Sequence, residues 1–145
     1  MRLATPGDNA SGVVQVHDER EQIQQVEDMI LAELGRQGYP QASEFAIRLA
    51  FEEAITNAFE HGHREQPHES VTVEYEVNPR TVRISIEDKG PGFDPAGIPD
   101  PTLDENLDKP FGRGLMLIRS FMSEVVYNAA GNRLTMRYDR PSNGS

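Results

Sequence analysis

The sequence contains no cysteine and no tryptophan among its 145 residues. The absence of cysteine excludes disulfide bonds, thiolate metal sites and cysteine nucleophiles. No apolar run approaches the roughly 20 residues that a membrane-spanning helix requires. Residues 1–12 also carry no apolar stretch of the kind found in signal peptides. These absences predict a cytoplasmic protein with no membrane partner.

Basic side chains are few, since the sequence has 14 Lys and Arg against 24 Asp and Glu, a formal net charge of −10. A protein that binds the phosphate backbone of nucleic acids normally shows a basic stripe. None is visible here, so we expect no direct nucleic-acid partner. The acidity leaves nucleotides open, because a divalent cation and a few local donors can hold phosphates inside an acidic protein.

Hydrophobic periodicity predicts both helices and strands. Helical spacing predicts one helix from an Asp18 cap to Gly35, a second from a Ser43 cap to about His61, and a third at about 113–123. Alternation predicts strands at Val13–Val16, Val71–Val77, Val82–Ile86, Val125–Tyr127 and Leu134–Tyr138. This order predicts an α+β two-layer sandwich, in which about three helices cover one face of a mixed, mostly antiparallel sheet.

One domain is expected over residues 13–139, between flexible segments at 1–12 and 140–145. Residues 89–110 are rich in proline, glycine and acidic side chains, which excludes regular structure there. A loop of this length inside a compact domain is usually functional. The sequence therefore predicts a lid between the strand at Val82–Ile86 and the third helix.

Three polar groups at helical spacing stand on the second predicted helix: Glu53, Asn57 and His61. Residues four apart form one stripe, and this stripe borders the apolar face. A carboxylate and an amide one turn apart can together handle a metal ion and a hydroxyl group. A solvated helix edge would show the same spacing, and this alternative stays open.

Two glycine-containing segments follow. Asp88 has the parity of Ile84 and Ile86, so a continuing strand would point its carboxylate into the buried layer, where it needs a partner such as a ligand amine. Gly90 and Gly92 then allow a sharp turn and a close approach of a ligand; an ordinary Asp/Gly turn is the alternative.

The second of these segments is Gly112-Arg113-Gly114. It would expose backbone N–H groups at a helix start and add a cation for an anionic ligand. Many helices without ligands also begin after glycine, so this motif is weak when it stands alone.

Taken together and in this order, the motifs E-x-x-x-N at Glu53 and Asn57, D-x-G-x-G at Asp88, and G-x-G-L at Gly112 resemble the ATPase superfamily shared by gyrase, the large stress chaperones, histidine kinases and MutL. Within that superfamily, a short stand-alone domain with E-x-x-x-N-A-x-x-H-G resembles the anti-sigma regulatory serine/threonine kinases. The resemblance covers roughly residues 13–139.

The resemblance implies ATP and Mg²⁺ as cofactors. It implies that Asn57 is the metal ligand, that Glu53 is the catalytic residue that orients or deprotonates the attacking hydroxyl, and that Asp88 binds the adenine amine. It also implies that Arg113 lies near the phosphates. Four glycines would then shape the pocket: Gly90, Gly92, Gly112 and Gly114.

The implied function is a protein serine/threonine kinase whose partners are a sigma factor and a small anti-anti-sigma antagonist protein. A homodimer is left open. Two alternatives remain: a non-catalytic ATP- or ADP-binding regulatory module, and a detached ATP-hydrolysing domain of a larger assembly.

Two weaker candidates complete the set. Three histidines could form a metal site: His61, His63 and His68. However, their sequence contexts differ, and no carboxylates stand at a spacing that would complete such a site. The superfamily usually carries a small hydroxyl residue near adenine on a late strand. In the segment from Gly131 to Thr135, the nearest candidate for this residue is Thr135.

Overall fold

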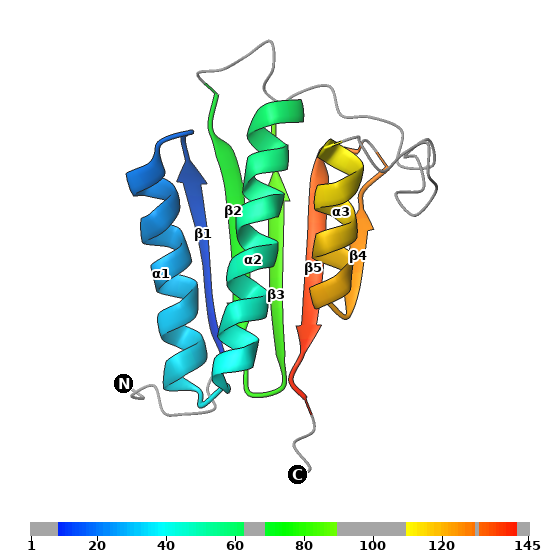
Figure 1. The fold of residues 1–145 in the computed structure, drawn as a ribbon. Helices are drawn as coiled ribbons and strands as arrows, with labels where there is room; N and C mark the ends of the chain where they lie inside the picture. Colours follow the sequence, from blue (N-terminus) through cyan, green and yellow to red (C-terminus); the bar gives the residue numbers. More distant parts are fainter. Residues whose placement is uncertain (1–8, 63–68, 90–109, 130, 142–145) are drawn as a thin grey trace.

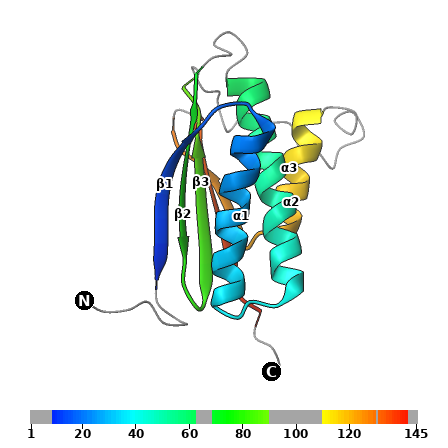
Figure 2. The same cartoon turned by 90° about the vertical axis from the view of Figure 1, so that its left-hand side faces the viewer.

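The computed structural model describes residues 9–62, 69–89, 110–129 and 131–141. Five strands form one sheet in the order β1-β2-β3-β5-β4. Figure 1 shows helices α1, α2 and α3 side by side in front of this sheet, and Figure 2 shows the two layers edge-on. The predicted two-layer α+β sandwich is therefore confirmed. All four strand pairs are antiparallel, so the sheet is more regular than the mixed one expected.

The elements follow one another in a simple order. They are β1 (Ala10–Val16), α1 (Arg20–Arg36), α2 (Gln41–Asn57), a π-helical turn η1 (Ala58–Gly62), β2 (Val71–Val77), β3 (Thr81–Glu87), α3 (Pro110–Phe121), β4 (Glu124–Tyr127) and β5 (Arg133–Asp139). None of the helices in the described parts of the chain is long and apolar enough to cross a membrane.

The core lies between the sheet and the helices. Alternate residues of β3 and β5 point toward the helices and are buried, as the period of two requires. They pack against the apolar faces of α1 and α2, where Ile30, Leu34, Ile47, Phe51 and Ile55 are fully buried. The opposite face of the sheet carries charged pairs and is open to solvent, which is usual for an antiparallel sheet.

Several element boundaries differ from the sequence prediction. β1 begins at Ala10 because the pairing with β2 extends to Val77. The cap position of α1 is Glu19 rather than Asp18, and no side chain caps it by a hydrogen bond. α3 begins at Pro110, three residues early, since proline is well suited to the first helical position.

Ser43 and Arg140 also have other roles than predicted. Ser43 lies inside α2, fully buried, and its hydroxyl is 2.8 Å from the Tyr138 hydroxyl of β5. Arg140, expected in a frayed tail, donates to the carbonyl oxygens of Gln37 and Gly38 and stacks on the Tyr39 ring. The chain is thus fixed to the α1–α2 connection just after β5.

Candidate functional site

The C-terminal end of α2 carries the first two candidate residues. Glu53 is half-buried, whereas Asn57 is the last residue of α2 and only 8 % exposed. The π-helical turn Ala58–Gly62 follows directly, and such turns often occur at functional sites. The side chain of His61, the third member of the predicted stripe, lies outside the described residues, as do His63 and His68.

The amide nitrogen of Asn57 is buried and has no hydrogen-bond acceptor among the described residues. Leaving a buried donor unpaired costs about 1–3 kcal/mol. An amide in a buried position is therefore retained at a cost to stability, which a ligand would offset. The amide can rotate about its last torsion, so that either its nitrogen or its oxygen can face that ligand.

Helix α3 lies against this amide without a side chain in between. A Cβ atom built on Gly114 would be 3.0 Å from Glu53 Oε2 and 3.1 Å from Asn57 Nδ2. Contacts that short are tighter than Cβ atoms normally make, so a side chain at this position would require Glu53 and Asn57 to shift. The structure therefore brings together the first and third predicted motifs.

The other residues of the third motif lie in the first turns of α3. Gly112 and Arg113 belong to this helix, whose first N–H groups have no partner within it. The side chain of Arg113 lies outside the described residues. Figure 1 shows that the N-terminal end of α3 and the C-terminal end of α2 lie at the same end of the molecule.

Asp88 follows β3 directly and continues its pairing, since its N–H donates to the carbonyl oxygen of Asn132 at 2.9 Å. Its half-buried position has the parity of Ile84 and Ile86, as predicted, and so lies on the helix-covered face. Gly90 and Gly92 of the same motif, and the proposed lid, lie outside the described residues.

Tyr127 of β4 is close enough to Asp88 for their charges to interact. The pKa of the Tyr127 hydroxyl is raised to about 12, mainly by burial; the Asp88 carboxylate raises it further, while Arg119 of α3 lowers it. Tyr127 also packs against the hydrophobic core, so an aromatic residue of β4 lies within electrostatic range of the predicted adenine-binding carboxylate.

Thr135 does not lie beside Asp88. Its hydroxyl is 2.9 Å from the Ser85 hydroxyl on the open face of the sheet, away from the helices. The expectation for Thr135 is corrected, because the residue opposite Asp88 is Asn132, which directly precedes β5. Counting back by two from buried Leu134 would have identified Asn132 from the sequence.

The position of Asn132 is fixed by the turn between β4 and β5. The Asn128 carboxamide oxygen accepts from the N–H groups of Gly131, Asn132 and Arg133, and its nitrogen donates to Asn132 Oδ1 at 2.9 Å. Gly131 adopts a φ of 77°, a left-handed conformation that glycine takes without strain. The Asn132 side chain is thus held by Asn128 at the edge of the candidate site.

Arg20, Glu27 and Glu52 form a charged cluster, in which Glu52 directly precedes Glu53 in the sequence. Arg20 of α1 makes two hydrogen bonds to the Glu52 carboxylate, at 2.8 and 3.0 Å, and thereby lowers the pKa of Glu52. Glu27 is 4 % exposed, and burial together with Glu52 raises its pKa to about 7. This cluster joins α1 to α2 beside the site.

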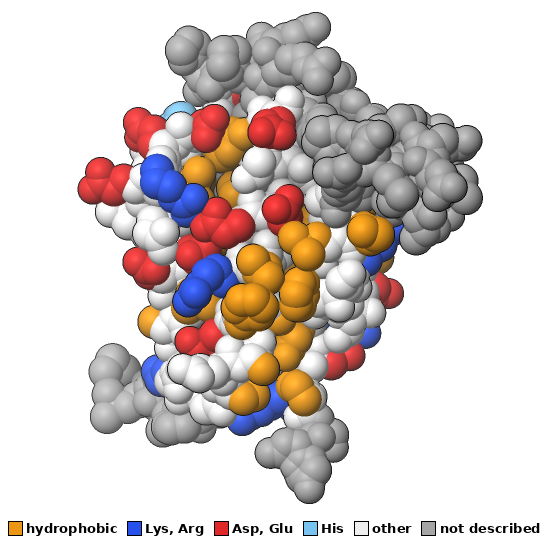
Figure 3. Space-filling model, viewed as in Figure 1, with side chains coloured by type: hydrophobic (Ala, Val, Ile, Leu, Met, Phe, Trp, Pro, Cys, Tyr) orange, Lys and Arg blue, Asp and Glu red, His pale blue; other side chains and the backbone are white. Residues whose placement is uncertain are grey.

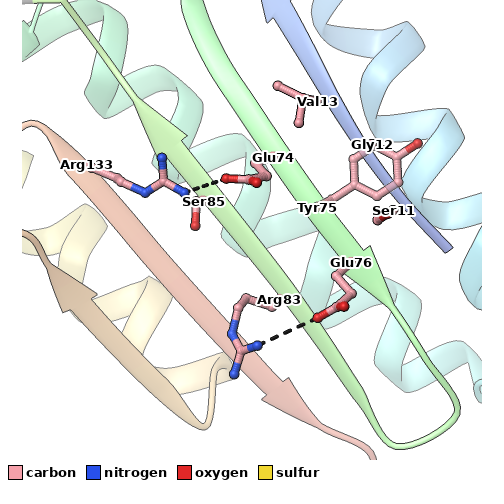
Figure 4. A pocket seen from close by; sticks show the side chains of 9 residues that line it. All are labelled: Ser11, Gly12, Val13, Glu74, Tyr75, Glu76, Arg83, Ser85 and Arg133. Atoms are coloured by element: carbon pink, nitrogen blue, oxygen red, sulfur yellow. Dashed lines mark hydrogen bonds and ion pairs between the residues drawn. The ribbon is translucent and has the colours of Figure 1, made fainter. Parts of the chain in front are cut away.

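A separate cavity of about 460 Å³ lies on the open face of the sheet (Figure 4). Its charged residues already pair with one another: Glu74 with Arg133, and Glu76 with Arg83. None of the candidate residues lines it. The candidate site therefore remains at the α2–α3 end, where the unpaired amide nitrogen of Asn57 lies.

The arrangement fits a magnesium ion held on a nucleotide. Within the described residues, no group of three His, Asp or Glu side chains could hold a metal alone. Mg²⁺ does not require such a group, because it keeps several waters and is usually bound through one or two protein ligands and the phosphates of a substrate. One buried amide beside a carboxylate and the first turn of a helix matches this pattern.

Comparison with known proteins identifies relatives of this chain. Curated relatives include an anti-sigma F factor of Oceanobacillus iheyensis, 32 % identical over 63 % of this chain and 64 % of the relative, and one of Geobacillus thermodenitrificans, 30 % identical over the same shares. The chain thus spans less than two thirds of the length of these relatives.

A crystal structure of the RsbU and RsbW domains of a Mycobacterium tuberculosis protein superposes with a TM-score of 0.61 and 18 % identity, covering 91 % of this chain and 33 % of that one. It supports the fold. The model of the histidine kinase-like ATPase domain matches residues 16–138, nearly the whole chain. The chain therefore belongs to the histidine kinase-like ATPase domain family.

Proposed function

We propose that this protein is an ATP-dependent protein serine/threonine kinase that acts in the cytoplasm as an anti-sigma factor. The observation that carries the proposal is the close approach of Gly114 to Glu53 and to the buried, unpaired amide of Asn57. Family membership implies ATP binding, and the likeness to anti-sigma F factors supports the regulatory role.

In this proposal the nucleotide lies across the ends of α2, α3 and β3. The Asp88 carboxylate accepts a hydrogen bond from the adenine amine, with Asn132 and Tyr127 beside it. The phosphates lie at the start of α3, where N–H groups without a partner inside the helix, the absence of side chains at Gly112 and Gly114, and the Arg113 cation favour an anion. Gly90 and Gly92 complete the pocket in the same way.

Asn57 would hold Mg²⁺ through its amide oxygen. When bound, the ion neutralises phosphate charge and aligns the terminal phosphate for transfer. The residue suits this role because its side chain is buried at the end of α2, and its amide nitrogen has no acceptor among the described residues that would oppose a rotation of the amide.

Glu53 would act as the base. The Ser or Thr oxygen of the acceptor protein forms a bond to the γ-phosphorus, and the bond from that phosphorus to the β–γ bridging oxygen breaks. ADP leaves with this oxygen, while the hydroxyl proton passes to the Glu53 carboxylate and then to water. Catalysis in such transfers comes mostly from positioning and charge stabilisation, and the α2–α3 contact would position Glu53 and Asn57 for it.

The acceptor in this proposal is a small anti-anti-sigma antagonist protein. Its unphosphorylated form competes with a sigma factor for this chain, and phosphorylation releases it. The sigma factor is then held again, so that transcription responds to the phosphorylation state of the antagonist.

Incubation of the purified protein with Mg²⁺, γ-labelled ATP and a panel of purified antagonist proteins tests the proposal. We expect label on a Ser or Thr of one panel member. Free labelled phosphate without a labelled partner would indicate an ATP-hydrolysing domain instead. Nucleotide binding without any turnover would indicate a non-catalytic regulatory module.

A further inference from the structure

An apolar patch lies on the outer surface between α2 and α3. Phe45 of α2 is 54 % exposed, and its ring meets the ring of Phe121 of α3 edge-on, with centroids 6.0 Å apart. Leu49 and Leu117 are half-buried on the same two helices. We call these four residues the docking patch. Figure 3 shows hydrophobic side chains gathered over this part of the two helices.

The docking patch runs along the same pair of helices that forms the candidate site. Gly114 meets Glu53 at one end of the pair, and Phe121 meets Phe45 at the other, so α2 and α3 run antiparallel side by side. Glu53 follows Leu49 by one turn and Phe45 by two, which corresponds to about 6 Å and about 12 Å along the helix axis.

We propose that the docking patch binds the protein whose hydroxyl is phosphorylated, an inference that rests on the proposed kinase function. An acceptor hydroxyl that reaches Glu53 brings the surface around it against the next two turns of α2. The fitting partner is a small protein that carries apolar side chains within about 12 Å of its Ser or Thr hydroxyl.

The geometry favours this partner over a second copy of the chain. A second copy seated permanently on Phe45 and Leu49 would crowd the approach to Glu53 and block phosphate transfer. The patch itself contains no charged side chain, although the chain carries a net charge of −10. Its contribution to binding therefore comes from burial of apolar surface, with the exposed aromatic Phe45 as the main anchor.

Phe45→Ala is the test variant, and Val126→Ala is its matched control. Val126 is also apolar and 50 % exposed, but it lies on the open face of the sheet. The probe is the antagonist protein that the wild type phosphorylates most efficiently. We expect Phe45→Ala to raise the KM for this acceptor by about tenfold to a hundredfold, with kcat and Mg-ATP affinity unchanged.

Further outcomes separate the alternatives. Phe45→Leu restores much of the lost acceptor binding, and Val126→Ala behaves as wild type. An unchanged KM in Phe45→Ala overturns the proposal, and so does a wild-type dimer that this variant converts to a monomer in sedimentation, because the patch then holds a second copy.

If the wild type phosphorylates no panel member, the kinase function fails, and docking is measured by calorimetry on the same panel with Mg-ADP. If the wild type binds a panel member and Phe45→Ala does not, the docking-patch proposal stands. If no panel member binds, or if the wild type and Phe45→Ala bind equally well, the docking-patch proposal is overturned.

Discussion

Gly114 of α3 lies so close to Asn57 of α2 that an added Cβ would be 3.1 Å from its amide nitrogen and 3.3 Å from its amide oxygen. The missing side chain of one helix therefore makes room for the polar group of another. This contact joins two motifs that are 57 residues apart in the sequence, and it leads directly to a test.

Gly114→Ala should separate nucleotide binding from stability. Alanine in a helix interior is favoured over glycine by about 0.5–1 kcal/mol, so the fold should tolerate the change. The new methyl group should displace Glu53 and Asn57 and weaken Mg-ATP binding by about tenfold or more. Calorimetry with Mg-ATP and thermal unfolding measure the two effects.

The matched control is Gly35→Ala in α1, where an added Cβ would meet nothing within 4 Å. It should gain similar helix stability and bind Mg-ATP as the wild type does. If Gly114→Ala also binds like wild type, the α2–α3 contact does not form the phosphate site.

Asp88→Asn tests the adenine assignment. The replacement amide can present a donor where the adenine amine needs an acceptor, and loss of a hydrogen bond to a charged group costs roughly 1.5–3 kcal/mol. We expect ATP binding to become roughly tenfold to a hundredfold weaker, as measured by calorimetry. Asp139→Asn, an exposed residue paired with Arg137, is the control and should leave affinity unchanged. Equal affinity in Asp88→Asn and wild type would show that adenine is bound elsewhere.

The stability of the protein should depend on pH through Glu27. Its pKa is raised from an ordinary value of 4.5 to about 7, first by burial and then by the neighbouring Glu52. The folded state therefore keeps a proton that the unfolded chain releases. This contribution is fully present below about pH 4.5 and is lost as the pH rises through 7.

Glu27→Gln should remove this dependence, since the amide stays neutral. Denaturant unfolding between pH 5 and 8 should show the variant gaining stability relative to wild type as the pH rises. Asp28→Asn, at the exposed neighbouring position, should follow the wild-type curve. Parallel curves for Glu27→Gln and wild type would contradict the assignment of the raised pKa.

The sequence predicted what depends on periodicity. Alternation in Val82, Ile84 and Ile86 identified β3 and its buried face, and the same parity placed Asp88 on the helix side. The spacing of four placed Glu53 and Asn57 on one side of α2. These features depend on local geometry alone, because the strand and helix periods hold whatever the rest of the chain does.

The sequence could not predict what depends on distant contacts or on a turn. Ser43 has a capping residue's chemistry, but its hydroxyl bonds Tyr138, which is 95 positions away. The position of Asn132 opposite Asp88 follows from the pairing of β5 with β3, which joins residues more than 40 positions apart. The proximity of Gly114 to Asn57 likewise follows from the packing of α3 on α2, which no local pattern specifies.

Glu53→Gln decides whether the site performs catalysis or only binds nucleotide. The substitution keeps the size of the side chain and removes the negative charge beside the phosphates. We therefore expect Mg-ATP to bind at least as tightly as in wild type, while the rate of phosphate transfer to the acceptor falls by ~10²–10⁴-fold, the usual effect of removing a general base.

Glu52 is a poor control for Glu53→Gln, because its carboxylate pairs with Arg20 and its loss would disturb the α1–α2 contact. Glu44→Gln, in the first turn of α2 and away from Gly114, should transfer phosphate at the wild-type rate. Should Glu53→Gln also transfer phosphate at that rate, another residue must accept the hydroxyl proton, and the role given to Glu53 would be wrong.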